Sequence, residues 1–175
     1  CLGSTGIILS RSNENKLSNN LVETNDEGIL LDNSTNNTLM NNTAKSNDIG
    51  LLLGTSITNM LENNSISKNS YGVVLENMAE SNTLTNNSLS MNGLGIYLRG
   101  ATSNMIFLNK FFNFINAVDE GTNSWNSSSA GNKWKDYNGT DADGNGIGDT
   151  PYVVNQTTGS IDYMPLANNV SSNNQ

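Results

Sequence analysis

The chain has 175 residues, of which 35% are hydrophobic, and its formal net charge is −8 from 16 acidic and 8 basic residues. This length is usual for a single domain. The acidic balance, without any Lys/Arg cluster, argues against nucleic acid and anionic membranes as partners. Histidine is absent, which removes the most common general base and transition-metal ligand. No apolar run approaches the roughly 20 residues that span a bilayer, so we expect no membrane insertion.

The only cysteine is Cys1, so no disulfide can form within the chain. A cysteine in this position is compatible with the lipid-bearing residue of a processed lipoprotein, and also with the boundary of a segment of a longer protein. The repeat described next is already in phase at Gly6. This immediate start favours the boundary.

An asparagine-rich repeat of about 22 residues runs along most of the chain. Each unit starts with an asparagine and has another five residues later, and the first four units also have an asparagine after ten residues and a glycine after thirteen. The unit starts are Asn15, Asn37, Asn59, Asn82 and Asn104, and the glycines in phase are Gly6, Gly28, Gly50, Gly72 and Gly95. The third unit is one residue longer, and we expect the extra residue to form a bulge within residues 76–81.

Apolar residues recur at fixed positions in every unit and alternate with period two, which predicts strands rather than helices. After the glycine, for example, come Ile29 and Leu31 in one unit and Val73 and Leu75 in another. Three short strands per unit predict an all-β, parallel β-helix of about five coils over residues 1–124. We expect aliphatic ladders inside and asparagine ladders at the corners, where this side chain tolerates a left-handed backbone.

One column of residues between the inward positions of the glycine-led strand should point outward, yet all of its members are apolar. They are Ile8, Leu30, Leu52, Val74 and Tyr97. An apolar stripe of this length needs a cover. Two covers are open: the C-terminal segment folding back with Trp125, Trp134 or Tyr137, or a lateral interface with another chain or domain.

Residues 125–166 should form a loop-rich cap in which Trp134, Tyr137, Tyr152 and Tyr163 pack together, followed by a disordered tail over residues 167–175. Within the cap, the segment DADGNGIGD places oxygen ligands at the spacing of an EF-hand-type loop and predicts a structural Ca²⁺. The expected ligands are Asp141, Asp143, Asn145, the carbonyl of Ile147, and Asp149. Tyr152 replaces the usual bidentate glutamate, so Asp136, Asp162 or water would have to complete the site. The alternative is an Asp/Gly-rich turn without metal.

The unit NTLTNNSLSMNGLGIYLRGATS (82–103), the segment GNKWKDYNGTDADGNGIGDTPYVV (131–154) and the later IDYMPL (161–166) together resemble the NosD-like β-helix family. This family is also grouped with carbohydrate-binding and sugar-hydrolysis β-helices. The resemblance implies right-handed coils and a place outside the cell or on its surface. The copper role in the family's name is not carried over, because soft metals need clustered Cys, His or Met ligands and the methionines stand at differing offsets in the repeat.

Catalysis is not expected, because the carboxylates of the repeat are scattered and form no pair at matching offsets in adjacent coils. Arg99 should pair with Glu76, which has the same offset one coil earlier. Two functions remain open. One is a structural or assembly module of a surface protein, joined to itself or to neighbouring coils, and the other is a carbohydrate-binding module; a polysaccharide-processing enzyme is less favoured. Sequons at Asn126, Asn138 and Asn155 permit glycosylation.

Overall fold

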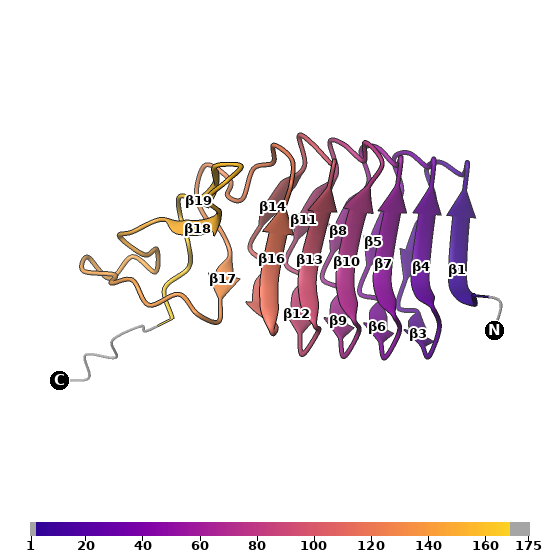
Figure 1. The fold of residues 1–175 in the computed structure, drawn as a ribbon, viewed down its shortest axis with the longest axis horizontal. Coiled ribbons are helices and arrows are strands. Elements are labelled where there is room, and N and C mark those ends of the chain that lie inside the picture. The colour runs from indigo at the N-terminus through magenta and orange to yellow at the C-terminus, as the bar shows by residue number, and fades with distance from the viewer. Residues whose placement is uncertain (1–2, 169–175) are drawn as a thin grey trace.

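The computed structural model describes residues 3–168, so Cys1 lies outside the described part of the chain. These residues form a right-handed parallel β-helix with a loop-rich segment at its C-terminal end, as expected (Figure 1). Sheet A contains β1 (Thr5–Ser10), β4 (Glu27–Asp32), β7 (Ile49–Gly54), β10 (Tyr71–Glu76), β13 (Leu94–Arg99) and β16 (Ile115–Asp119). Sheet B contains β2 (Lys16–Ser18), β5 (Thr38–Met40), β8 (Met60–Glu62), β11 (Thr83–Thr85) and β14 (Met105–Phe107). Sheet C contains β3 (Leu21–Glu23), β6 (Thr43–Lys45), β9 (Ser65–Ser67), β12 (Ser88–Ser90), β15 (Lys110–Phe112) and β17 (Lys133–Trp134).

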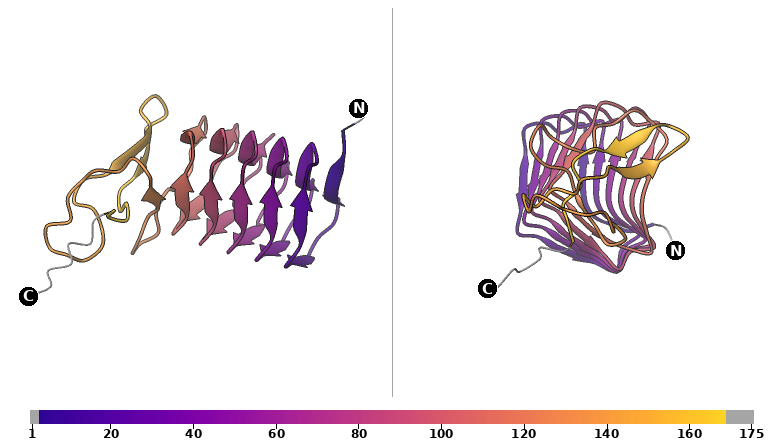
Figure 2. Two further views of the ribbon diagram at one scale, coloured as in Figure 1. Left: turned by 90° about the horizontal axis from the view of Figure 1, so that it is seen from below. Right: turned by 90° about the vertical axis from the view of Figure 1, so that its left-hand side faces the viewer.

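Each strand of the three sheets pairs in parallel with the strand one coil further along. Ile29 lies opposite Leu51, and Leu51 opposite Val73, so positions one repeat apart stack directly. The view along the helix axis shows the three sheets as the walls of one tube (Figure 2). The repeat length read from the sequence is therefore the length of one coil.

The core is a set of aliphatic columns inside this tube. The inward residues of sheet A, such as Ile29, Leu31 and Leu75, have no exposed surface. Leu39 in sheet B and Ile66 in sheet C meet them from the other walls. Because every coil contributes only a few apolar side chains to a narrow core, the chain folds with a low overall share of hydrophobic residues.

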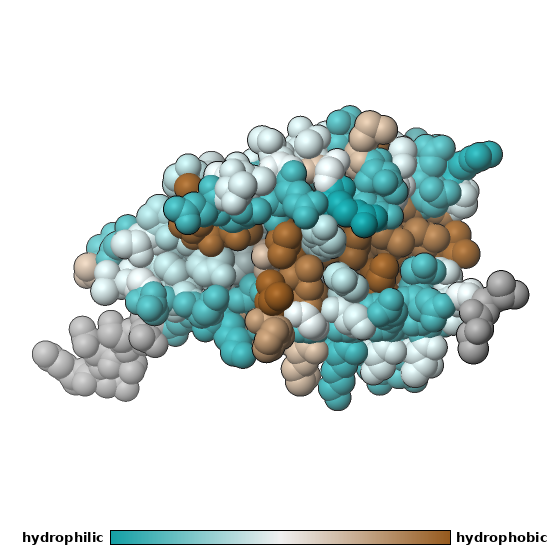
Figure 3. All heavy atoms as spheres, in the orientation of Figure 1, coloured by the Kyte–Doolittle hydropathy of each residue, from teal (hydrophilic) through white to brown (hydrophobic). Residues whose placement is uncertain are grey.

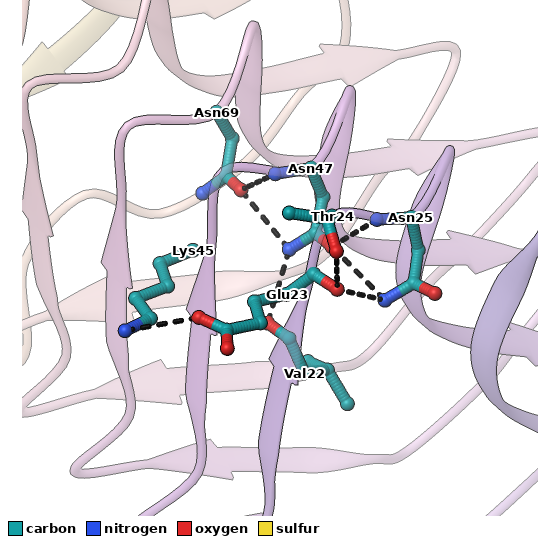
Figure 4. Close-up of polar contacts among 7 residues, drawn as sticks. All are labelled: Val22, Glu23, Thr24, Asn25, Lys45, Asn47 and Asn69. Atoms are coloured by element: carbon teal, nitrogen blue, oxygen red, sulfur yellow. Dashed lines mark hydrogen bonds and ion pairs between the residues drawn. The ribbon is translucent and has the colours of Figure 1, made fainter.

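Three asparagine ladders join successive coils at the corners. At one of them, the Asn47 amide donates to Asn69 Oδ1 at 3.2 Å and to the carbonyl of Val22 at 3.3 Å, while the backbone N–H of Asn25 donates to Asn47 Oδ1 at 3.0 Å (Figure 4). The ladder side chains thus point inward and bind backbone groups that the strands leave unpaired at the bends.

Asparagine was expected at the corners because it tolerates a left-handed backbone, and for the ladder residues this reason is wrong. The left-handed residue is the one before the ladder asparagine, as at Asn63 (φ 55°) and Lys68 (φ 58°). Asn64 and Asn69 then turn their side chains into the coil. The ladder asparagine is selected for its amide, which both donates and accepts, and its neighbour carries the unusual backbone angle.

The extra residue of the third unit forms the expected bulge after β10. Asn77 and Met78 both have left-handed backbones, with φ of 53° and 66°, and the Ala79 N–H closes the turn on the carbonyl of Glu76 at 3.1 Å. The next ladder asparagine returns to register, so the insertion is absorbed before the following strand begins.

Aromatic side chains close the C-terminal end of the core. The Trp134 ring stacks between Phe111 and Tyr152, with ring-centroid distances of 4.5 Å and 4.2 Å, and Trp125 packs against Phe111 and Trp134. Tyr163 is 62% exposed, so the expectation that it packs in this cluster is wrong.

Two fully buried aspartates hold the cap in place. Asp119 accepts the indole N–H of Trp125 at 2.8 Å, and Asp162 accepts that of Trp134 at 2.9 Å. Asp162 lies in the antiparallel hairpin of β18 (Tyr152–Asn155) and β19 (Ser160–Asp162). The hairpin is thereby fastened to the last coil.

Asn168 extends the cap by donating to the carbonyls of Trp134 and Tyr137 at 2.7 Å each. The expected disordered tail over 167–175 therefore starts with residues that contact the cap, and its remainder, residues 169–175, lies outside the described residues. No helix in residues 3–168 has the length and apolar character needed to cross a bilayer.

Candidate functional site

The outer face of sheet A carries two columns of outward apolar residues. The expected stripe is present: Ile8, Leu30, Leu52, Val74 and Tyr97 lie opposite one another in successive strands. A second outward column runs beside it and becomes apolar from the third coil onward, with Ile49, Tyr71, Leu94 and Ile115. Figure 3 shows the resulting hydrophobic band across the strands of sheet A.

Two covers were considered for the stripe. In the described residues, the C-terminal segment does not fold back over it with its aromatic side chains. Trp125 and Trp134 pack against Phe111 at the end of the coil stack. The Tyr137 hydroxyl instead donates to the carbonyl of Thr150 at 2.7 Å within the cap. Ile8, at the other end of the stripe, remains 54% exposed.

A shallow hollow interrupts this face at its centre. It has a volume of about 210 Å³ and is lined by Ile49, Tyr71, Val74, Glu76, Tyr97 and Arg99. Tyr71 and Tyr97 come from the adjacent strands β10 and β13, and their rings are nearly parallel, with centroids 6.5 Å apart and planes inclined by 22°. Val74, only 5% exposed, adds an apolar side chain to the lining of the hollow.

Charged residues form the other side of the hollow. Arg99 makes the predicted ion pair with Glu76, its partner one coil earlier. The Tyr97 hydroxyl donates to Glu120 Oε1 at 2.9 Å, and this hydrogen bond with the nearby carboxylate raises the pKa of Tyr97 above its usual value. The hollow therefore combines aromatic rings with a rim of paired charges.

The sequence revealed only part of this site. Tyr97 was expected in the outward stripe and Arg99 in an ion pair, but Tyr71 and Ile49 were missed. Each of them directly precedes a glycine of the repeat. A simple alternation of faces does not place Tyr71 on the outer face, but Tyr71 is exposed and Gly72 is buried. The position of Tyr71 opposite Leu94 in the next unit was a signal that could have revealed the second column.

The acidic loop of the cap lies far from this hollow in sequence and is held by its own hydrogen bonds. Asp141 accepts the backbone N–H groups of Asn145 and Gly146 at 3.0 Å each. Asp149 accepts the N–H of Ala142 and the hydroxyl of Thr140 at 2.9 Å each. The carboxylates thus cap the backbone of a tight turn.

Comparison with known proteins gives one family. A family model described as "Periplasmic copper-binding protein (NosD)" matches residues 2–139. No curated protein sequence matches the chain. The periplasmic description of the family agrees with the location outside the cytoplasm that the resemblance implied.

The expected calcium cofactor is wrong. The matching family is described as copper-binding, not calcium-binding. Within residues 3–168, no group of three or more His, Cys, Asp or Glu side chains is placed to hold a metal ion. The alternative of a metal-free Asp/Gly-rich turn accounts for the hydrogen bonds of Asp141 and Asp149.

The residues of this chain also fit copper poorly. The chain has no histidine, and copper sites otherwise need clustered sulfur ligands. Met60 and Met105 share a column of sheet B, but the strand of Thr83 separates them. Met78 and Met91 are exposed on turns that follow different sheets.

The family model covers most of the chain, including all complete coils and the start of the cap. The asparagine corners, the glycine column and the right-handed stack of coils described above belong to this matched region. The chain is a member of the NosD family of β-helix proteins.

Proposed function

We propose that this chain is a non-catalytic structural module that acts outside the cytoplasm and associates laterally with a second copy through the outer face of sheet A. The continuous apolar stripe on this face carries the proposal. Apart from Val74, the residues of the stripe are partly or largely exposed to water, and burying them against a like surface would remove the unfavourable exposure of their apolar surface.

The contrast with sheet C supports this choice of face. Its outward residues in the middle coils are Ser65, Ser67, Ser88 and Ser90, with Lys45 bound to Glu23 at 3.0 Å one coil earlier. A polar wall of this kind remains in water without penalty. Association through sheet A would therefore bury apolar surface, whereas association through the middle coils of sheet C would not.

The dimensions of sheet A predict a weak contact. Six strands about 4.8 Å apart and about six residues long cover roughly 400 Å² per partner, or about 800 Å² in total. Stable protein interfaces usually bury about 1,200 Å² or more. We therefore expect association at high local concentration, as in a surface array, and a monomer in dilute solution.

The placement of the carboxylates supports a non-catalytic role. Glu23 and Glu76 are engaged by Lys45 and Arg99, while Asp119 and Asp162 are buried and bind indole N–H groups of the cap. Hydrolysis by paired carboxylates would need two such groups facing one substrate site.

Sedimentation velocity over a range of protein concentrations tests the proposal. The wild type should shift reversibly toward a dimer as concentration rises, and more so at high salt, because screening reduces the repulsion between chains of charge −8. Leu30→Lys should abolish the shift, whereas Ser67→Lys on sheet C should preserve it. A wild type that stays monomeric at millimolar concentration, or equal effects of both variants, would refute lateral association through sheet A.

A further inference from the structure

We propose that the C-terminal end of sheet C docks on the surface of an anionic phospholipid membrane. The surface concerned, called the Lys/Phe corner, combines unpaired lysines with exposed apolar side chains, and it lies on a different wall of the tube from the apolar stripe of sheet A. Its members are Met91, Lys110, Phe112, Phe114, Lys133 and Lys135.

The stacking of coils brings three lysines together. Lys110 in β15 lies directly opposite Lys133 in β17. Lys135 follows two residues after Lys133, and its backbone N–H donates to the carbonyl of Phe111 at 2.9 Å. Alternate residues of a strand share a face, so all three lysines belong to the outer side of sheet C, with Trp134 buried on the inner side. The sequence shows no cluster, because Lys110 and Lys133 are separated by one whole coil.

The charges of these lysines are not neutralised by neighbouring carboxylates. Within residues 3–168 the ion pairs are Lys45 with Glu23 and Arg99 with Glu76, so the three lysines have no such partner. Asp136, next in the chain, accepts the amide of Asn116 at 2.8 Å and the hydroxyl of Tyr152 at 3.1 Å and is held by the cap. At physiological salt, charges more than about 8 Å away are largely screened. The corner therefore presents positive charge locally, although the chain as a whole is acidic.

The apolar part of the corner consists of side chains that extend into water. Phe114 is 89% exposed, and Phe112 and Met91 are 40% and 64% exposed. Met91 is adjacent to Phe112, because its backbone N–H donates to the Phe112 carbonyl at 2.9 Å. Moving such apolar surface out of water is favourable, so these residues would gain from an apolar environment.

The repeat shows that the β-helix does not need these side chains. The Phe114 N–H donates to the carbonyl of Asn92, and the residues that make the equivalent bond in earlier coils are Asp48, Ser70 and Gly93. Phe112 lies opposite Ser90, and Lys110 lies opposite Ser88. The same positions thus accept small or polar residues in other coils, and the apolar and basic residues of the corner require another explanation.

A phospholipid membrane offers both environments that the corner lacks. Lysines alone would also suit a soluble polyanion or the acidic surface of a second copy, but neither of these gives Phe112 and Phe114 an apolar medium. At an anionic membrane, lysines meet the phosphates while neighbouring aromatic rings enter the boundary between headgroups and acyl chains. The exposed rings therefore favour the membrane over the other two partners.

Co-sedimentation of the full chain with vesicles tests this proposal. We expect binding to vesicles of phosphatidylcholine mixed with phosphatidylglycerol, little binding to phosphatidylcholine alone, and weaker binding at high salt. Lys110→Ser should weaken binding about fivefold, which is the effect of one lysine near an anionic surface. Phe114→Ser should weaken it by about fivefold or more, because the ring can no longer be buried.

Two matched controls come from other parts of the tube. Met78→Ser removes an exposed apolar side chain at the bulge after β10. Lys16→Thr removes a lysine of sheet B and introduces the residue type of Thr38, which lies opposite it. Both variants should bind the mixed vesicles as the wild type does, and circular dichroism melting curves establish that all four variants are folded.

Three results would overturn the proposal. The first is no binding to the mixed vesicles, and the second is an equal loss in the corner variants and their controls. The third is binding that Lys110→Ser weakens, that Phe114→Ser leaves unchanged and that polyphosphate abolishes, since the ligand would then be a soluble polyanion. Leu30, which tests association, lies in sheet A, so either role can fail without the other.

Discussion

Asn64 donates both its backbone N–H and its side-chain amide to one atom, Oδ1 of Asn87, at 2.9 Å each. The same amide also donates to the carbonyl of Leu39 at 2.9 Å. Asn42, one coil earlier, binds Asn64 Oδ1 in the same way. Each ladder asparagine thus connects three coils, and the corner of the β-helix depends on an unbroken series of these amides.

Asn64→Ala should therefore be strongly destabilising. The substitution leaves the N–H of Asn42 and the carbonyl of Leu39 without their side-chain partner in a buried corner, and each unsatisfied buried group costs about 1–3 kcal/mol. We expect a loss of about 3 kcal/mol or more, measured by urea unfolding with circular dichroism. The exposed Asn138→Ala is the matched control and should change the stability by less than about 0.5 kcal/mol. Equal effects at both positions would contradict the ladder account.

Alanine substitutions at two glycines of sheet A should have opposite effects on stability. A Cβ added to Gly72 would lie 2.4 Å from the carbonyl oxygen of Gly95 in the next coil, whereas a Cβ on Gly54 would meet no atom within 4 Å. Gly72→Ala forces the backbones of two coils apart and should cost about 1–3 kcal/mol or more. Gly54→Ala should be neutral or stabilising by up to about 1 kcal/mol. Thermal unfolding of the two variants side by side gives the comparison, and a stable Gly72→Ala protein would show that the coils are less closely packed than described.

The fold was readable from the sequence because a β-helix stacks equivalent positions. Apolar pairs such as Ile29 and Leu31 recur in every unit, so one coil predicts the others. The inward orientation of Asn64 could not be predicted. Two adjacent positions at the corner both favour asparagine, one because its backbone is left-handed and the other because its amide points inward. Asn63 and Asn64 look alike in sequence but have these two different roles.

The cap should respond to pH through Asp162. Burial raises the pKa of this carboxyl above its usual value, although hydrogen bonds from Asn132, Trp134 and Met164 act in the opposite direction. With a folded-state pKa above the unfolded one, the stabilising contribution is fully present below the unfolded pKa of about 3.9 and is lost as the pH rises through the folded value. Tryptophan fluorescence should therefore report a cap that unfolds more easily as the pH is raised from about 4.

Asp162→Asn tests the assignment of this pH dependence. The amide cannot ionise, so the slope in this pH range should be reduced, whatever the absolute stability of the variant. Asp143→Asn changes an exposed carboxyl of the acidic loop and should leave the slope in place. A slope that is unchanged in Asp162→Asn would assign the effect to another group.

Metal removal should not affect the acidic loop. Asp141 and Asp149 already bind backbone N–H groups that hold the turn. We expect the melting temperature to be the same in a chelator and in millimolar CaCl₂, as measured by differential scanning calorimetry. A rise of several degrees with calcium alone would contradict the hydrogen-bonded account of the turn.

The acidic loop and the hollow show where reading the sequence failed. Alternating Asp and Gly residues satisfy both a calcium loop and a turn capped by its own carboxylates, and only the geometry around Asp141 distinguishes them. Tyr71 was missed for a related reason, because the alternation of buried and exposed residues breaks at Gly72, which is buried next to the exposed Tyr71. In both places the backbone path, and not the residue type, determined the role.

Disulfide cross-linking tests the lateral contact of sheet A most directly. In a Cys1→Ser background, Leu52→Cys places one thiol near the centre of the apolar stripe, and Ser67→Cys places one on the polar face of sheet C. With mild oxidant and concentrated protein, we predict a covalent dimer for Leu52→Cys and a much smaller yield for Ser67→Cys. Equal yields from the two positions, or none from Leu52→Cys, would contradict an assembly role for this face.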